Sequence, residues 1–144
     1  MWTESVRLGC EIKKLSRAIN YNLEKILSEK VSGLTYMQAR VITYLSRHNG
    51  ESIYQRDLEK AFQIRGPSVT SLLQVMEKND LIIRSRVSHD ARLKRLELTE
   101  KSIQINQTIE ECVVRHEESI RAGLTEEETK IFLSLMQKIE QNLQ

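Results

Sequence analysis

The sequence predicts a mainly α-helical fold that carries one small β-hairpin, and three observations lead to this. The 144 residues include one Pro and five Gly, which is few for a loop-rich or all-β protein. Apolar residues recur at steps of three and four along most of the chain, which is the spacing of a helix face. Only residues 81–98 break this period, with two short strand-like runs around a polar turn. A chain of this length is expected to form a single domain, residues 1–144.

The first helix is predicted over residues 3–30. Ile12, Leu15, Ile19, Leu23 and Ile26 form one apolar stripe on it. At ~1.5 Å per residue, a helix of this length is longer than a compact domain of this size is wide. We therefore expect part of the stripe to pack on something other than the chain's own core.

The second helix is predicted to begin after Thr35, because Thr35 and Gln38 have the spacing of a capping box. Gly50 can adopt the left-handed turn that ends a helix. The inner face of this helix is expected to consist of four apolar residues, Met37, Val41, Ile42 and Leu45.

Two short helices are predicted next, joined by a tight link at Gly66 and Pro67. Proline near the start of a helix costs no hydrogen bond and presets φ. Asn79 and Asp80 both tolerate the left-handed conformation at the exit. The expected inner faces are Leu58, Ala61 and Phe62 on the first of these helices, and Val69, Leu72, Leu73 and Met76 on the second.

A hairpin and two further helices complete the predicted order. Strands are predicted at residues 81–86 and 94–98, with Ser88, His89 and Asp90 in the turn. Thr99 can cap a long helix that Gly123 interrupts, and Thr125 with Glu128 forms another capping box. The apolar faces of these two helices are Ile105, Ile109, Cys112 and Ile120 on one, and Ile131, Leu135, Met136, Ile139 and Leu143 on the other.

Two short helices followed by a two-stranded hairpin describe a winged helix-turn-helix. Its second helix is the right size to enter the major groove of DNA. The outer face of this helix carries short or amide side chains, which can approach base edges and phosphates. An ordinary solvated helix face would look the same, and the helix alone does not decide between the two. The candidate DNA-contacting residues are Arg65, Pro67, Ser68, Thr70, Ser71 and Gln74.

The hairpin favours the interpretation as a DNA-binding segment. Its segment from Arg84 to Arg95 carries five cations and a single acid, Asp90, so these charges repel one another unless an anion lies opposite. The narrow minor groove of A·T-rich DNA has a negative potential that attracts Arg. Asp90 is expected to pair with Arg92 and fix its direction, although an exposed ion pair of this kind is common on any surface. The candidate contacts of the hairpin are Arg84, Arg86, Asp90, Arg92 and Lys94.

Composition and motifs exclude several other classes of protein. The net charge is only +2, from 22 Lys and Arg and 20 Asp and Glu, with the hairpin basic and the segment 110–128 acidic. There is no apolar run of membrane-spanning length and no signal-peptide core at the N-terminus, so we expect a cytoplasmic protein. The sequence contains no phosphate-binding Gly loop, HExxH motif or nucleophile elbow, so we expect no enzyme. His48, His89 and His116 match no metal-ligand spacing, and we expect no metal or cofactor.

Three stretches in order resemble the MarR/SlyA family of bacterial transcription regulators: "LTYMQARVITYL", "IRGPSVTSLLQVMEKNDLI" and "HDARLKRLELTEK". The resemblance spans residues 34–101. It implies a winged-helix DNA-binding part at 34–98 and helical dimerisation parts at 1–33 and 99–144. Asp80 stands where the family usually has Gly, and Ser102 where Gly or Ala is common. Both are small polar replacements at helix ends.

The resemblance also implies how such a protein works. It implies an obligate homodimer whose recognition helices enter successive major grooves of a near-palindromic site, about 34–36 Å apart. Arg92 would insert into the minor groove. The protein would be a sequence-specific regulator, more often a repressor, whose DNA affinity responds to a small aromatic or phenolic ligand. Candidate ligand-lining residues, many of which could equally be core, are Leu15, Tyr36, Arg40, Tyr44, Cys112 and His116.

Two alternatives remain open at the level of sequence. Some relatives of this kind sense oxidants through a cysteine in the first helix, and Cys10 lies near that place, although a structural thiol is the favoured interpretation. A winged helix can also serve as a protein-interaction module that never touches DNA. A steep dependence of nucleic-acid binding on salt would identify the DNA binder.

Overall fold

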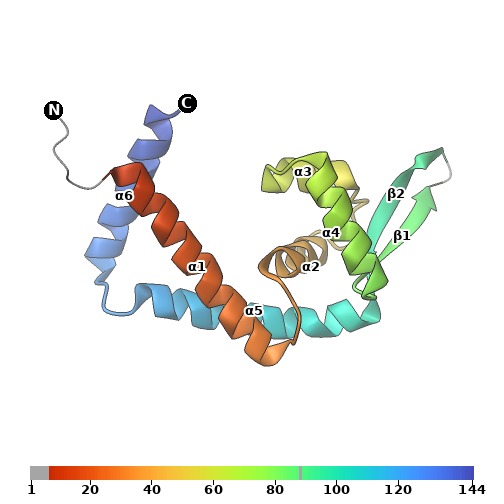
Figure 1. Ribbon diagram of the computed structural model, residues 1–144, viewed down its shortest axis with the longest axis horizontal. Coiled ribbons are helices and arrows are strands. Elements are labelled where there is room, and N and C mark those ends of the chain that lie inside the picture. The colour runs from red at the N-terminus through yellow and green to blue at the C-terminus, as the bar shows by residue number, and fades with distance from the viewer. Residues whose placement is uncertain (1–6, 88) are drawn as a thin grey trace.

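The computed structural model describes residues 7–87 and 89–144. Its order is four helices, a β-hairpin and two more helices, which confirms the predicted mainly α class (Figure 1). The first helix begins at Leu8; its predicted residues 3–6 lie outside the described residues. The elements are α1 (Leu8–Lys30), α2 (Tyr36–Arg47), α3 (Gln55–Phe62), α4 (Gly66–Lys78), β1 (Ile82–Val87), β2 (Asp90–Leu98), α5 (Glu100–Arg121) and α6 (Glu126–Asn142).

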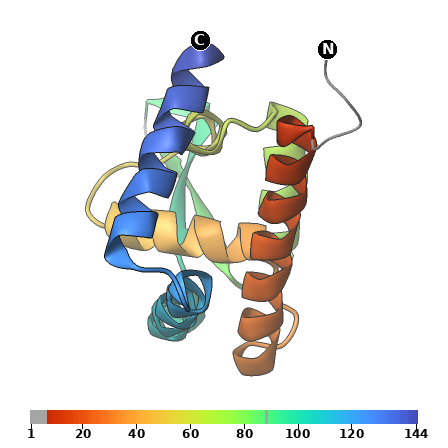
Figure 2. The same cartoon turned by 90° about the vertical axis from the view of Figure 1, so that its left-hand side faces the viewer.

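The chain has a compact lobe and two protruding helices. Figure 1 shows α2, α3, α4 and the hairpin gathered at one end of α5, while α6 and the N-terminal part of α1 lie beyond its other end. Figure 2 shows α1 and α6 as two separate helices that rise from opposite sides of α5. We call α1 and α6 the arms. None of the helices in the described part of the chain is long and apolar enough to span a membrane.

The core fills the lobe, includes the C-terminal part of α1 and leaves α6 out. Leu27, Ile42, Leu58, Leu73 and Met76 are fully buried in it, together with parts of the hairpin and α5. Burial of this apolar surface is the main favourable term in folding. Each described helix of the lobe contributes apolar side chains from one face to this core, as the helical periodicity predicted.

Only half of the α1 stripe belongs to this core. Leu23 and Ile26 are buried, whereas Ile12 and Leu15 are 44% and 47% exposed. The same holds for α6, whose apolar residues all stay outside the core. The exposed apolar residues of α6 and the link before it are Leu124, Ile131, Phe132, Leu133, Leu135, Met136 and Leu143.

The predicted caps are present. In α2 the Gln38 amide N–H donates to Thr35 Oγ1 at 3.2 Å, and the Thr35 N–H donates to Gln38 Oε1 at 3.1 Å. The start of α6 repeats this arrangement with Thr125 and Glu128. Each capping box satisfies backbone N–H groups that a helix otherwise leaves unpaired.

Three details of the prediction were wrong. Ala61 is exposed on α3, so it is not part of the inner face. The second strand begins at Asp90 rather than Lys94, because the pairing with β1 continues past Lys94 through an irregularity between Arg86 and Val87. The α5 stripe also ends before Ile120, which is 38% exposed.

The two departures from the family pattern meet where α4, β1 and α5 join. Asp80 has a φ of 58°, in the left-handed region that favours Gly. Its carbonyl accepts a hydrogen bond from Thr99 Oγ1 at 2.7 Å. The hydroxyl of the fully buried Ser102 donates to the Leu81 carbonyl. Both residues therefore take part in hydrogen bonds that anchor the hairpin to the start of α5, while Asp80 keeps the left-handed conformation.

Candidate nucleic-acid interface

The outer face of α4 carries the predicted polar side chains. Pro67, Ser68, Ser71 and Gln74 are exposed, and Arg65 is exposed just before the helix begins. The inner residues Val69, Leu73 and Met76 are fully buried and fix the rotation of the helix about its axis. The sequence therefore predicted correctly that Pro67, Ser68, Ser71 and Gln74 are turned outward, whereas Thr70 is half-buried.

Thr70 differs from its neighbours because its hydroxyl is already hydrogen-bonded within the lobe. Thr70 Oγ1 donates to the Gly66 carbonyl at 3.0 Å and accepts a hydrogen bond from Gln55 Nε2 at 2.8 Å. The Gln55 amide also lies within hydrogen-bonding distance of Glu59 Oε1, at 3.2 Å. We call the cluster of Gln55, Glu59, Gly66 and Thr70 the α3–α4 clasp. The clasp fixes α4 relative to α3, and the Thr70 hydroxyl is already hydrogen-bonded within it.

A side chain at Gly66 would displace the end of the flexible Glu59 side chain from the clasp. A Cβ built at this position would meet Glu59 Oε1 at 2.7 Å. Gln55 was not predicted as a residue of the site, because a glutamine at the start of a short helix matches no motif. The signal that identifies it is spatial: its amide reaches 15 residues along the chain to Thr70.

One face of the hairpin is turned toward α4. The register pairs Arg84 with Leu96 and Arg86 with Lys94, so these side chains share a face with the buried Leu96. Arg84 Nε donates to Glu77 Oε2 on α4 at 2.7 Å, and the Arg84 side chain is only 17% exposed. Arg84 thus joins the wing to α4.

The expected pairing of Asp90 with Arg92 takes a different form. Asp90 Oδ1 accepts a hydrogen bond from the backbone N–H of Arg92 at 2.8 Å. No ion pair joins the two side chains in the described part of the chain. Asp90 therefore shapes the backbone at the tip of the wing and leaves the Arg92 guanidinium free.

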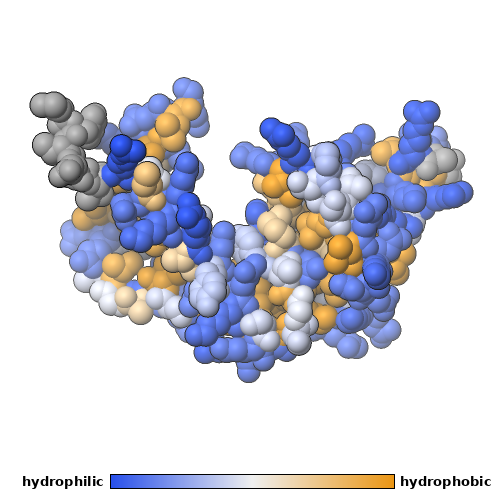
Figure 3. Space-filling view, viewed as in Figure 1, coloured by the Kyte–Doolittle hydropathy of each residue, from blue (hydrophilic) through white to orange (hydrophobic). Residues whose placement is uncertain are grey.

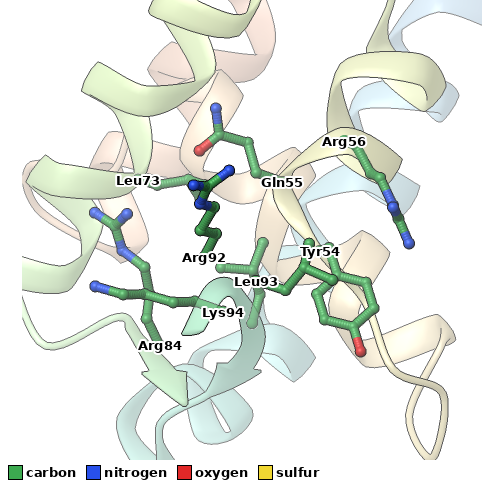
Figure 4. A pocket seen from close by; sticks show the side chains of 9 residues that line it. Tyr54, Gln55, Arg56, Leu73, Arg84, Arg92, Leu93 and Lys94 are labelled. Atoms are coloured by element: carbon green, nitrogen blue, oxygen red, sulfur yellow. The ribbon is translucent and has the colours of Figure 1, made fainter. Parts of the chain in front are cut away.

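A cavity of about 230 Å³ lies between α3, α4 and the wing. Figure 4 shows the Arg92 guanidinium directed toward Gln55 and Leu73, with the side chains of Arg84 and Lys94 beside it. Arg56 also lines the cavity but points away from these cations, and it lies over the Tyr54 ring at 5.3 Å. The cavity therefore brings three cations of the wing against the helix-turn-helix.

The six candidate ligand-lining residues make their contacts in separate groups. Tyr36, Arg40 and Tyr44 gather on α2 with Phe62, where the Arg40 guanidinium lies 4.3 Å from the Phe62 ring centre. The Tyr44 ring also stacks on His48 at 4.1 Å between ring centres. This α2 aromatic group holds three of the six residues.

The other three candidates lie elsewhere. Leu15 is exposed on the α1 arm. Cys112 and His116 are buried where α1 crosses α5, with His116 Nδ1 lying 2.8 Å from Asn22 Oδ1. That the six residues line one ligand site stays a prediction.

The two cysteines have opposite environments. Cys10 is exposed near the start of α1, and Cys112 is buried. Burial raises the pKa of the Cys112 thiol above its usual value, because removal from water disfavours the thiolate. In the described part of the chain, no three His, Cys, Asp or Glu side chains cluster as a metal site would require.

The winged part of the chain matches a known family. Residues 32–93 match the model of the MarR family. The chain resembles the structure of the S. aureus MepR–DNA complex with a TM-score of 0.87, at 24% identity over 96% of this chain and 99% of that one. At that identity the likeness shows the fold.

Two further structures are more similar in sequence. The transcription regulator MarR from Oenococcus oeni PSU-1 matches with a TM-score of 0.73 and 29% identity, over 93% of this chain and 98% of that one. The transcriptional regulator PA3341 matches with a TM-score of 0.72 and 28% identity, over 94% and 96%. The family model, the sequence and the architecture therefore agree in their similarity to MarR-family regulators.

Proposed function

We propose that the protein is a sequence-specific DNA-binding transcription regulator, and that it acts as a repressor in the bacterial cytoplasm. The observation that carries this proposal is the pairing of an exposed polar face on α4 with uncompensated cations on the adjacent wing. Arg65, Arg86, Arg92 and Lys94 form no ion pair with any described residue. Cations left unpaired on one surface bind a polyanion by releasing its counterions. The MepR and MarR structures reported above support the same assignment.

In this proposal α4 reads base edges from the major groove. Ser68, Ser71 and Gln74 are the side chains that face outward, and their hydroxyl and amide groups suit base and phosphate contacts. Thr70 takes part only through the clasp. Arg65 sits at the helix entrance, where a backbone phosphate would lie. The wing lies along the neighbouring minor groove, with Arg86, Arg92 and Lys94 toward the duplex.

We propose further that the regulator is a homodimer joined by its arms. The arms leave apolar residues exposed, including Ile12 and Leu15 on α1. Figure 3 shows hydrophobic side chains at the surface on the left of the view, where the arms lie. Exposed apolar surface on this scale marks an interface. A two-fold axis would bring the same surface of both protomers together, with each contact made twice, and in this proposal it separates the two α4 helices by one turn of DNA, about 34–36 Å.

A small aromatic or phenolic ligand is proposed to modulate DNA affinity. The α2 aromatic group is the best supported contact for such a ligand, because it combines ring faces with the Arg40 cation. One structural relative, PefR from Streptococcus agalactiae, is a heme sensor whose structure contains heme, at 22% identity. A ligand that shifts DNA affinity must bind one spacing of the α4 helices better than another.

The first experiment is selection of duplexes from a random pool, followed by affinity measurements at several salt concentrations. We expect enrichment of a near-palindrome and a steep fall in affinity with salt. Arg92→Ala should cost about 1–3 kcal/mol of binding free energy. A selection that enriches no sequence, or binding that ignores salt, would overturn the proposal and favour a protein-interaction module. A promoter-fusion reporter then distinguishes repression from activation.

A further inference from the structure

We propose that the α3–α4 clasp makes Thr70 a hydrogen-bond acceptor toward DNA, so that α4 selects a base with an exocyclic amino group, adenine or cytosine, beside Thr70. The inference rests on the proposed DNA-binding function and states what Thr70 contributes to it through the clasp. Gln55 does not touch the duplex in this proposal. It is a positioning residue that acts through the Thr70 hydroxyl.

The orientation of the Gln55 amide is the first argument. Its Nε2 lies 2.8 Å from Thr70 Oγ1, 3.2 Å from Glu59 Oε1 and 3.3 Å from the Gly66 carbonyl oxygen. A carboxylate and a carbonyl only accept hydrogen bonds. The nitrogen of the amide, rather than its oxygen, must therefore face these groups, and the shortest of the three contacts is the donation to Thr70.

The direction of the Thr70 hydroxyl follows from this orientation. A hydroxyl group has one donor hydrogen and two acceptor lone pairs. Thr70 Oγ1 accepts a hydrogen bond from Gln55 Nε2, and it donates its hydrogen to the Gly66 carbonyl at 3.0 Å. One lone pair is left, so any further partner of this hydroxyl has to be a donor.

Thr70 stands at the border between the clasp and the exposed face of α4. Its side chain is half-buried, so part of its surface stays open. The exposed Gln74 lies one turn further along the same side of the helix, because residues four apart are neighbours on a helix surface. The fully buried Val69 and Leu73 hold the helix at this rotation. With α4 in the major groove, we therefore expect the remaining lone pair of Thr70 to face a base edge.

The base edges of the major groove differ in what they offer to an acceptor. Adenine presents the amino group at N6 and cytosine the amino group at N4, whereas guanine presents two acceptors and thymine presents an acceptor and a methyl group. Beside guanine or thymine, the Thr70 lone pair would therefore have no donor. A free hydroxyl could turn and donate to these bases, but the clasp leaves Thr70 only the acceptor role.

The test measures the relative affinity for all four bases at every position of the selected duplex. We expect wild type to prefer adenine or cytosine about tenfold over guanine or thymine at one position in each half-site, because the mismatch leaves polar groups unpaired. Gln55→Met keeps the length of the side chain but removes the N–H donor, so the Thr70 hydroxyl can turn. The preference at that position should then fall below about twofold, while the ratios at other positions stay as in wild type.

Variants of Thr70 provide the controls. Thr70→Ser is the matched one, because it keeps the hydroxyl and loses only the methyl group, and it should keep the tenfold preference. Thr70→Ala removes the hydroxyl, and the preference should fall as in Gln55→Met. Adding Gln55→Met to Thr70→Ala should change the ratios no further, because the group through which Gln55 acts is gone. The two Thr70 variants decide the matter by themselves if Gln55→Met does not fold.

Three results would overturn the inference alone. The first is a Gln55→Met variant that keeps the preference, or that loses affinity for all sequences by one common factor, which would make the clasp purely structural. The second is a Thr70→Ser variant that loses the preference, which would assign it to the methyl group. The third is a selected site without any such position. In these cases wild type still selects its site, so the proposed function stands. Wild type that selects no sequence removes both.

Discussion

Replacing Leu135 with Ala is expected to weaken the dimer measurably. Leu135 lies on α6 and is 53% exposed in the single chain. Full burial of a Leu side chain stabilises by about 1.5–3 kcal/mol. If dimerisation covers the exposed half, each copy contributes about 0.8–1.6 kcal/mol. Two-fold symmetry doubles this to about 1.6–3.2 kcal/mol per dimer, or roughly a 10- to 200-fold rise in the dimer dissociation constant.

Analytical ultracentrifugation with a fluorescent label measures that constant down to low concentrations. Ile83→Ala is the matched control, because Ile83 is 49% exposed but lies on the wing, away from the arms. The control should leave the dissociation constant unchanged. Equal constants for wild type and Leu135→Ala would show that α6 is not in the interface. An equal loss in both variants would indicate nonspecific association instead of a dimer through the arms.

Three further outcomes follow from the local structure. Ser102→Ala should lower the free energy of unfolding by about 1–2 kcal/mol in a thermal melt, because it leaves the buried Leu81 carbonyl without its donor; an unchanged melt would mean that water replaces the hydroxyl. Asp80→Gly should raise that free energy by up to about 1 kcal/mol, because Asp80 has a φ of 58°, and a drop would show that the aspartate stabilises the turn. Iodoacetamide at pH 8 should label Cys10 and spare Cys112, which is buried with a raised pKa; equal labelling would show that α1 separates readily from α5.

Local signals in the sequence were sufficient to predict the order of helices and strands in this fold. The structure confirms the helix starts predicted from Thr35 with Gln38 and from Thr125 with Glu128. A capping box can be recognised in the sequence because its two residues lie only three positions apart. The exposed half of the α1 stripe was also predictable, since the stripe is longer than the lobe. Both cases depend on spacing along one helix.

Contacts between distant segments were not predictable. The reach of Gln55 to Thr70 and the engagement of Arg84 with Glu77 depend on how α3, α4 and the wing pack, which no local pattern encodes. The contacts of the candidate ligand residues were not predictable either, such as the stacking of Tyr44 on His48 and the 2.8 Å approach of His116 Nδ1 to Asn22 Oδ1. The extent of β2 was missed because strand pairing continued through an irregularity.

The central claim is that two recognition helices, set apart by the arms, hold one duplex. A hydroxyl-radical footprint of the protein on its selected site, combined with the protein-to-DNA ratio at saturation, tests it most directly. We expect two protomers per site and two protected regions whose centres are separated by about 10–10.5 base pairs. A single protected region with one protomer per site would contradict it, and so would equal protection of selected and random duplexes.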